Sequence, residues 1–274
     1  MAEVHAEIGI VGGSGFYELL RDAEELRVDT PFGTPSDAVT VGELAGRRVA
    51  FLPRHGRGHR LPPHRIDFRA NLWALHSLGI SRLISPSAVG SLRAELRPGT
   101  FVLLDQLVNR TWGRSDTFFD GPQAPDGFRT VTHVSLTDPY CPELRRLAAE
   151  RCVELGLEHH EDGTCVVIQG PRFSTRAESR WYSAAGWDTV GMTQYPEVAL
   201  ARELQLCTLG IALVTDYDVG LAGRPEVEAV STAGVLEIFR ANLARLTRLL
   251  DALVPTVPAE RTCTCGSALE GAQL

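Results

Sequence analysis

Two polar segments hold the residue types that acid–base chemistry and anion binding require. Asp216 and Asp218 directly follow the apolar run 209–214, so two carboxylates stand two positions apart. Such a pair can hold one proton between its members and donate it near neutral pH. A divalent metal bound by the same carboxylates is the alternative interpretation. The second segment, 53–60, follows another apolar run and interleaves three arginines and two histidines with glycines, which is typical of an anion site.

The basic segment has its own alternative. His55, His59 and His64 are possible metal ligands, but the arginines around them would repel a cation. Arg54 is the arginine nearest the preceding strand, and with His55 it is the candidate for holding an anion.

Four further segments follow apolar runs and are rich in small residues, hydroxyls or flat side chains. Glycines in such positions let the backbone approach an anion closely. In each segment an ordinary turn is the competing interpretation, and Ser174 is also a candidate helix N-cap. The first segment lacks a complete dinucleotide fingerprint because Glu18 stands where a small residue is needed. The segments are Gly12-Gly13-Ser14-Gly15, 87–91 with Ser87 and Ala88, 169–178 with Phe173 and Ser174, and 191–197 with Gly191, Met192 and Thr193.

The elements that must position these segments are predicted by the hydrophobic pattern. Short apolar runs and helical periods alternate along the chain, which predicts an α/β fold. We expect one domain with a core at 8–254 and a small polar tail at 255–274. Since loops at the carboxyl ends of strands converge in such sheets, the polar segments should share one site. Strands are predicted at 8–11, 39–41, 48–52, 82–85, 101–107, 163–168 and 207–214, and helices at 68–78, 142–155, 174–185, 197–204 and 235–253.

Composition excludes several classes of function. The 274 residues carry a net charge of −7, and all 27 basic residues are arginine, because the sequence contains no lysine. A lysine Schiff base and a Walker A phosphate loop are therefore excluded. The acidic balance argues against nucleic-acid binding. No signal peptide or membrane-length apolar run is apparent, so we expect a cytoplasmic protein without membrane contact.

Cysteine usage agrees with a reducing compartment, because six cysteines are scattered along a long chain. Cys263 and Cys265 form a C-x-C pair near the end of the sequence. Two thiols cannot make a structural zinc site alone. A strained, redox-active disulfide or a structurally unimportant tail are the remaining interpretations of this pair.

Taken together, the motifs resemble those of the methylthioadenosine phosphorylase branch of the trimeric purine nucleoside phosphorylases. The resemblance extends from Ile8 to about Leu253 and implies a phosphorylase/hydrolase-like fold with a mixed central β-sheet flanked by helices. Its specificity comes from the order and spacing of the motifs together. The most specific pieces are Gly12-Gly13-Ser14-Gly15, Arg54-His55-Gly56, Gly170-Pro171-Arg172-Phe173-Ser174, Met192-Thr193 and Asp216-Tyr217-Asp218.

The resemblance assigns a role to each matching position. Asp216 and Asp218 would be catalytic and would read N7 and the 6-amino group of a purine. Met192 would pack against the ribose and Phe173 would line the nucleoside site. His133 would reach into the site of a neighbouring subunit in a homotrimer. Phosphate would be held by Ser14, Arg54, His55, Ser87, Ala88 and Thr193, and the 5′ substituent by Thr232, Val235 and Leu236.

The activity implied is phosphorolysis of the N-glycosidic bond of 5′-methylthioadenosine or a close 5′-deoxyadenosine analogue. Inorganic phosphate would be the co-substrate, with no metal or organic cofactor. Specificity should depend on Ser174, Gly191 and Thr232. Gly191 stands where adenosine-type members usually have Asn, and Thr232 stands where the 5′ pocket is usually apolar. Alternatives are a 6-oxopurine or broad purine nucleoside phosphorylase, a 5′-halo-5′-deoxyadenosine phosphorylase, and a non-catalytic nucleotide-binding protein.

Overall fold

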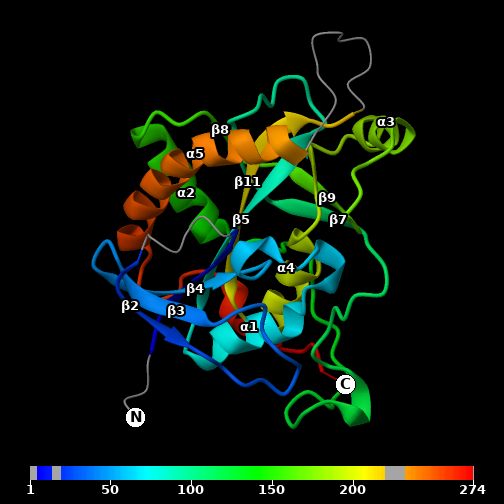
Figure 1. Cartoon of the computed structure of the whole chain (residues 1–274). Coiled ribbons are helices and arrows are strands. Elements are labelled where there is room, and N and C mark those ends of the chain that lie inside the picture. The colour runs from blue at the N-terminus through cyan, green and yellow to red at the C-terminus, as the bar shows by residue number, and fades with distance from the viewer. Residues whose placement is uncertain (1–4, 14–19, 220–231, 274) are drawn as a thin grey trace.

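A computed structural model describes residues 5–13, 20–219 and 232–273, with only the backbone at 232–237 and 239–241. Eleven strands of this described part form one mixed sheet (Figure 1). The mixed α/β fold predicted from the sequence is confirmed. The strands are β1 (Ile8–Gly12), β2 (Arg21–Leu26), β3 (Val39–Leu44), β4 (Arg47–Pro53), β5 (Arg82–Ser91), β6 (Phe101–Leu103), β7 (Gln106–Arg110), β8 (His159–His160), β9 (Thr164–Ile168), β10 (Thr189–Gly191) and β11 (Cys207–Tyr217). The helices are α1 (Phe68–Ser77), α2 (Pro142–Glu154), α3 (Arg176–Ala184), α4 (Gln194–Glu203) and α5 (Thr232–Leu253).

Strand β5 is the point where the sheet branches. The main path runs β2-β3-β4-β1-β5-β10-β9-β7, while β11 also pairs with β5 and leads to β6 and β8. Strands β4, β1, β5 and β11 pair in parallel, so their carboxyl ends emerge on the same side. The far end of β5 also pairs with β10, which brings the 189–193 region to that side.

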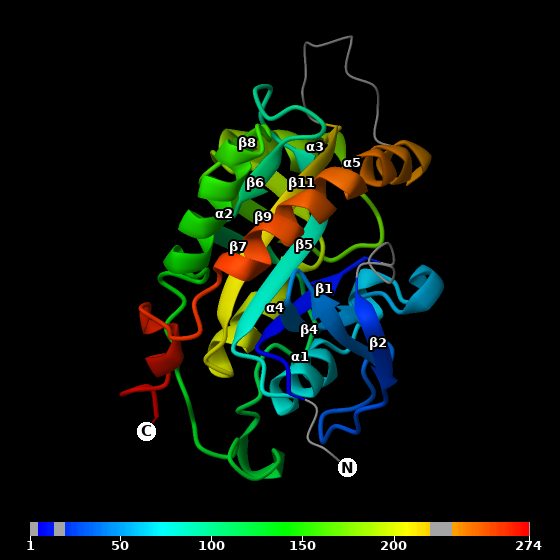
Figure 2. The same ribbon diagram turned by 90° about the vertical axis from the view of Figure 1, so that its left-hand side faces the viewer.

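Two layers of helices cover the sheet (Figure 2). Helices α2 and α5 pack together on one face, where Leu144 and Leu246 belong to the same buried cluster. Helices α1 and α4 pack together on the other, where Leu72 and Leu200 share a second cluster. The sheet is therefore buried on both faces, as expected for parallel strands with long apolar runs.

The start of α3 is capped by Thr175 and Glu178, which leaves the side chain of Ser174 outside the helix. The Thr175 hydroxyl accepts a hydrogen bond from the Glu178 backbone N–H at 3.2 Å, and the Glu178 carboxylate accepts one from the Thr175 N–H at 2.7 Å. This capping box satisfies two amides that the helix leaves unpaired. The prediction of Ser174 as the N-cap is therefore wrong, because the spacing to Glu178 fits Thr175. Ser174 lies outside the helix and faces a cavity described below.

Several strands extend further than the hydrophobic pattern predicted. The segment 87–91, expected to be a turn, belongs to β5, and residues 215–217 belong to β11. Small and polar residues stay extended there because β5 and β11 pair with each other up to Ser91 and Tyr217. The apolar run 101–107 forms two strands, β6 and β7, and the exposed, charged strand β2 was not predicted.

The C-terminal segment 255–273 packs against the body of the protein. Val257 and Cys265 are buried, and the carbonyls of Val257 and Pro258 accept hydrogen bonds from Arg47 and Arg82 at 2.8 and 3.0 Å. The predicted small polar tail thus carries buried residues.

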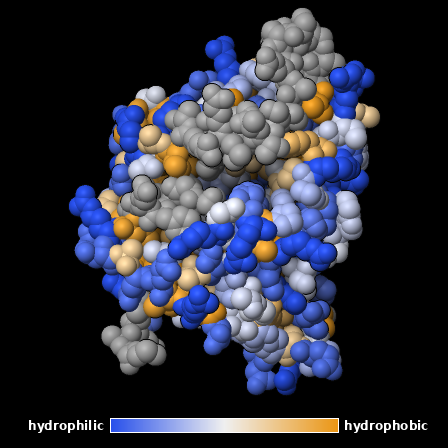
Figure 3. All heavy atoms as spheres, in the orientation of Figure 1, coloured by the Kyte–Doolittle hydropathy of each residue, from blue (hydrophilic) through white to orange (hydrophobic). Residues whose placement is uncertain are grey.

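No helix in the described ranges is long and apolar enough to cross a membrane. The face seen in Figure 1 is mostly hydrophilic, with hydrophobic residues in small separate patches (Figure 3).

Candidate active site

A cavity of about 770 Å³ lies where the parallel strands end. This volume is typical of small-molecule sites. The lining comes from the ends of β4, β5, β9, β10 and β11 and from the segments that follow them, so the polar segments do converge as expected. Of the predicted site residues, the cavity is lined by Arg54, His55, Ser87, Ala88, Phe173, Ser174, Gly191, Met192, Thr193, Asp216 and Asp218.

Of the remaining predicted site residues, only His133 has a described side chain, and it is not part of this lining. Ser14 lies outside the described residues, and so do the side chains of Thr232, Val235 and Leu236, although the backbone of the last three begins α5. Leu243 of the same helix does line the cavity. His133 is exposed in a loop away from the cavity, and its backbone N–H donates to the Ala272 carbonyl at 2.8 Å. Its predicted role requires a second subunit and stays a prediction.

Arg54 is buried at the floor of the cavity with its charge already paired. Its Nε and Nη2 donate to the two carboxylate oxygens of Glu197 at 2.7 and 2.9 Å, and both side chains are 2% exposed. Nη2 also donates to the Val11 carbonyl at 2.7 Å and the Ser85 hydroxyl at 2.9 Å, and Nη1 donates to the Pro86 carbonyl at 3.1 Å. The guanidinium has five N–H groups. One N–H of Nη1 is left for a cavity ligand.

Ser87 is oriented as a donor by a chain of hydrogen bonds. The Tyr140 hydroxyl donates to Oε1 of Gln194 at 3.0 Å, and Nε2 of Gln194 donates to the Ser87 hydroxyl oxygen at 3.1 Å. Because Ser87 accepts this bond, its own proton can point into the cavity. Gly210 makes the arrangement possible, since a Cβ there would lie 2.6 Å from a ring carbon of Tyr140.

His55 is held as a neutral imidazole. Burial, together with the positive charges of His59 and Arg54, lowers its pKa to about 3. Its Nδ1 lies 2.9 Å from the Leu61 carbonyl, which can only accept, so Nδ1 carries the proton. Nε2 is then an acceptor. His59 stacks on His55 with ring centroids 4.1 Å apart and also lines the cavity.

Asp216 is the carboxylate whose protonation is most altered. Burial raises its pKa to about 6, and the negative charge of Asp218 adds to the rise. The Thr215 hydroxyl donates to Oδ1 at 2.8 Å and offsets part of the rise. About a tenth of Asp216 is therefore protonated at pH 7, far more than for an ordinary aspartate, and this raised pKa suits a proton donor.

Asp218 has the stronger demand for a hydrogen-bond donor. It is 3% exposed, and its Oδ2 accepts no hydrogen bond from the described residues. Burial raises its pKa, while the Ser179 and Ser174 hydroxyls and the Val219 backbone N–H lower it again. A buried carboxylate oxygen without a donor is costly unless a ligand supplies one. This atom is thus the clearest indication of where a ligand N–H would bind.

Two glycines determine the space around the carboxylates. A Cβ on Gly90 would lie 3.3 Å from Oδ2 of Asp216, so glycine leaves room for both acids. A Cβ on Gly191 would lie 3.3 Å from the Cys165 sulfur and 3.3 Å from a methyl group of Val89. These two side chains therefore occupy the space that a larger residue at 191 would need.

Arg114 fixes the two cavity segments that carry Met192 and Phe173. Its guanidinium donates to the carbonyls of Met192, Tyr195 and Gln169 at 2.9, 2.5 and 2.8 Å. Gly170 then approaches Met192 so closely that a Cβ would lie 2.6 Å from the sulfur. The Met192 side chain is positioned from two sides.

The metal alternatives can be compared with the geometry. Among the residues that the structure describes, the only group of three or more His, Cys, Asp and Glu side chains able to hold one ion is a set of four cysteines away from the cavity. His55, His59 and His64 do not form such a group, and no third described residue of these types joins Asp216 and Asp218 in one.

Sequence reasoning missed the side chains that support the cavity. Glu197, Gln194, Tyr140, Arg114 and Ser179 act through contacts across the sheet, and no local motif marks them. Glu197 alone carried a usable signal, because an acidic residue inside an otherwise apolar helical stretch needs a buried partner.

Comparisons with known proteins agree with this arrangement. The model of the Phosphorylase superfamily matches residues 7–255. The chain is 56% identical over 272 residues to a purine nucleoside phosphorylase of Streptomyces coelicolor, covering 98% of this chain and 96% of that protein. It is 50% identical over 268 residues to an S-methyl-5′-thioadenosine phosphorylase of Thermofilum pendens, covering 97% and 98%. A structure of methylthioadenosine phosphorylase from Schistosoma mansoni in complex with adenine superposes with a TM-score of 0.89 at 35% identity, covering 98% and 99%. The chain therefore belongs to the phosphorylase superfamily.

Proposed function

We propose that the protein cleaves the N-glycosidic bond of 5′-methylthioadenosine, or a close 5′-deoxyadenosine analogue, with inorganic phosphate, giving adenine and a 5-substituted ribose 1-phosphate. The observation that carries the proposal is one cavity lined both by the buried Asp216–Asp218 pair and by donors suited to phosphate. In this proposal phosphate is the co-substrate, and cleavage uses no metal or organic cofactor.

The phosphate side would act mainly through donors aimed at the anion. Ser87 has a free hydroxyl proton, Thr193 and Ala88 line the same part of the cavity, and Arg54 offers one N–H. His55 would contribute differently, because its neutral ring presents Nε2 as an acceptor. Hydrogen phosphate has one P–OH group, and that group is the natural donor to Nε2. The bound anion would stabilise the positive charge that develops on the sugar.

The purine side would supply the proton and read the base. A protonated Asp216 would donate to N7 as the purine leaves, so the base departs without a full negative charge. Oδ2 of Asp218 lacks a donor and would accept from a 6-amino group. A 6-oxo group offers only an acceptor there, which supports a preference for adenine nucleosides.

A second candidate is a 6-oxopurine or broad purine nucleoside phosphorylase, and Gly191 favours it. The similar Streptomyces coelicolor protein carries the name purine nucleoside phosphorylase. The adenine preference is supported by Oδ2 of Asp218, which accepts no hydrogen bond from the described residues and suits a 6-amino donor.

The discriminating assay compares methylthioadenosine, adenosine, methylthioinosine and inosine, each with and without phosphate, and measures the free base released. We expect phosphate-dependent release, fastest with the 6-amino substrates. Base release without phosphate, or no release from any substrate, would contradict phosphorolysis. Faster release from the 6-oxo substrates would establish the second candidate.

Asp216→Asn tests whether Asp216 recognises the purine base and donates a proton to it. The amide can donate to a 6-oxo group or to N7 but cannot transfer a proton, so adenine release should fall by about 100-fold or more. The ratio of 6-oxo to 6-amino activity should rise at the same time. Unchanged adenine release would remove Asp216 from the reaction.

We also propose that three copies of the chain assemble and that His133 of one copy closes the site of the next. Exposed aromatic side chains beside the cavity support an interface there. Trp112 is 66% exposed, and its backbone N–H donates to the Gln169 side chain at 3.1 Å. Trp181 is 50% exposed, and Phe173 is partly exposed at the cavity. Large exposed aromatics are typical of interfaces.

Sedimentation equilibrium would determine the assembly, with Trp112→Ala as the interface variant and Val153→Ala, at an exposed position on α2, as its control. We expect a trimer for the wild type and the control, and dissociation for the Trp112 variant. A monomeric wild type with full activity would contradict the shared site.

A further inference from the structure

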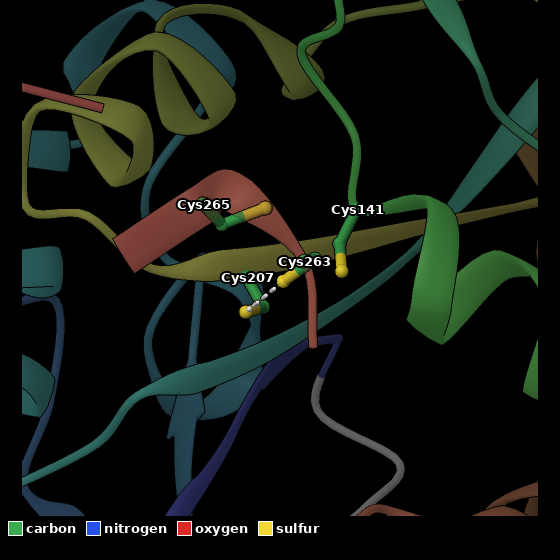
Figure 4. A group of neighbouring side chains, drawn as sticks. All are labelled: Cys141, Cys207, Cys263 and Cys265. Carbon is green, nitrogen blue, oxygen red and sulfur yellow. Dashed lines mark hydrogen bonds between the residues drawn. The ribbon is translucent and has the colours of Figure 1, made fainter. Parts of the chain in front are cut away.

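Four cysteines from three separate segments meet beside the sheet, on the face covered by α2 and α5 (Figure 4). Cys141 precedes α2, Cys207 begins β11, and Cys263 and Cys265 lie in the C-terminal segment. Their sulfur atoms all lie within 4.8 Å of one another. We propose that this thiol cluster is a structural site for one thiophilic divalent ion, with zinc as the ion it fits best.

The geometry of the thiol cluster suits a tetrahedral ion. A zinc ion with Zn–S distances of about 2.3 Å places its sulfurs about 3.8 Å apart. The sulfurs of Cys207 and Cys263 are 3.3 Å apart, and the rest lie within the 4.8 Å limit. Small side-chain rotations bring four such sulfurs around one ion. The C-x-C pair, insufficient alone, gains its two missing ligands from Cys141 and Cys207.

Hydrogen bonds outside the thiol cluster bring its segments together without the ion. The Cys141 N–H donates to the Thr208 carbonyl at 2.8 Å, which fixes the start of α2 against β11. Arg261 donates to the Gln205 carbonyl at 2.7 Å, and Thr262 donates to the Glu143 carboxylate at 2.5 Å. The ligands are therefore preorganised, and binding needs little rearrangement.

The surroundings can accommodate the charge of the site. Four thiolates around a doubly charged cation leave a net charge of −2. Cys141 occupies the N-cap of α2, where the helix amides favour a thiolate. Arg261 lies against the turn that carries Cys265, since a Cβ on Gly266 would be 2.9 Å from its Cζ. Glu143 is the acidic group in this region, and one of its oxygens accepts from Thr262.

Binding involves no oxidation or reduction. Four S–H groups release their protons to solvent and four metal–sulfur bonds form, so affinity should rise with pH. The competing chemistry is oxidation to disulfides, which joins sulfurs only in pairs. Two adjacent disulfides would also bring four sulfurs together, whereas a tetrahedral ion requires all four at once, and thiol alkylation separates the two.

The test measures zinc in full-length protein, without a polyhistidine tag, purified in the presence of a reductant. We expect about one zinc ion per chain by inductively coupled plasma mass spectrometry. Cobalt added to the metal-free protein should give the intense visible bands of tetrahedral cobalt thiolate. Cys263→Ser changes the least buried ligand and should lose most of the bound metal. The matched control, Cys152→Ser, changes a buried cysteine outside the thiol cluster and should retain it.

Thiol titration separates the site from its alternatives even if a variant folds poorly. In denatured wild-type protein without added reductant, a chelator should make all four cluster cysteines available for alkylation. Cluster cysteines that become alkylated only after reduction would establish disulfides and overturn the proposal. Protein that binds neither zinc nor cobalt after reconstitution would overturn it as well, leaving four buried thiols that only fill the core.

Discussion

Burial affects two titratable residues of the cavity in opposite directions. It keeps His55 neutral by lowering its pKa to about 3, and it keeps part of Asp216 protonated by raising its pKa to about 6. Desolvation penalises the charged form in both cases, and the charged form is the protonated one only in histidine. The cavity therefore holds an uncharged acceptor where we propose that phosphate binds and an acid where we propose that the purine binds.

The acid gives a prediction for pH dependence. Because the pKa of Asp216 is raised, its protonated form is present below about pH 6 and is lost above it. With phosphate saturating, kcat/KM for the nucleoside should fall as pH rises through this value, by about tenfold per unit once well above it. Asp216→Asn should show a low, flat profile in the same range. The same alkaline decline in the variant would assign it to another group.

Glu197 gives a prediction for stability. Glu197→Gln leaves the Arg54 guanidinium buried without a counter-charge, which should cost about 3–5 kcal/mol of unfolding free energy. Glu24→Gln is the matched control, because Glu24 pairs with Arg48 at 2.7 Å on the surface. Exposed pairs contribute about 0–1 kcal/mol. Chemical denaturation measures both variants, and equal losses would show that burial of the Arg54 pair carries no special cost.

Tyr140 acts on phosphate only through Gln194 and Ser87. Tyr140→Phe keeps the ring but removes one of the bonds that orient Gln194, whose Nε2 also donates to the carbonyl and hydroxyl of Ser85. We expect the bond from Gln194 to Ser87 to weaken, so the Ser87 hydroxyl can turn away from the cavity. A hydrogen bond of about 1 kcal/mol corresponds to a rise of about fivefold in the KM for phosphate. Steady-state kinetics should show an unchanged KM for the nucleoside. A rise of both KM values together would indicate general loosening of the core.

Residue types in the sequence predicted the side chains that line the cavity better than the side chains that hold them in place. Arg54, His55, Asp216 and Asp218 were identifiable because each lies at or just after the end of an apolar strand and carries a group suited to phosphate or to a purine. Glu197, Gln194 and Tyr140 were not, because their roles depend on contacts between segments far apart in the sequence. The same limit applies to Arg54, whose pairing with Glu197 changes what it can offer a ligand.

At the level of elements, the capping box of α3 links stability to the cavity. Thr175→Ala removes the hydroxyl that accepts from Glu178 and should lower the unfolding free energy by about 1 kcal/mol. Thr130→Ala, at an exposed position outside any helix, serves as its control. Thermal unfolding of both variants tests this, and indistinguishable melting temperatures would mean that Thr175 is not an effective cap.

The hydrophobic pattern predicted the bounds of buried strands and helices well, and those of strands with polar or exposed residues poorly. The apolar strands β1, β4 and β9 and helices α1 and α2 lie within a few residues of their expected bounds. The far ends of β5 and β11 were not predicted as strands. The small and polar residues there stay extended because the two strands pair with each other. Strand β2 has too little apolar character to be recognised, since its residues are almost all exposed.

At the scale of the whole molecule, the C-terminal segment connects distant regions. Deletion of residues 259–274 removes buried Cys265 and the hydrogen bonds of Arg261 and Thr262. The bond from the His133 N–H to the Ala272 carbonyl is lost as well. We expect a loss of about 2–4 kcal/mol of unfolding free energy, from these three hydrogen bonds and one buried side chain. Denaturant unfolding measures it, with deletion of Leu274 alone as the control. A truncated protein as stable as the control would mean that the segment is dispensable.

The bond between His133 and Ala272 has a practical consequence for handling the protein. A fusion partner or affinity tag attached after Leu274 would begin three residues beyond the Ala272 carbonyl that anchors the 130–133 loop. The bulk of such an addition would lie beside the loop expected to contact a neighbouring copy. Low activity of a carboxyl-tagged preparation would therefore reflect the position of the tag rather than weak catalysis by the enzyme.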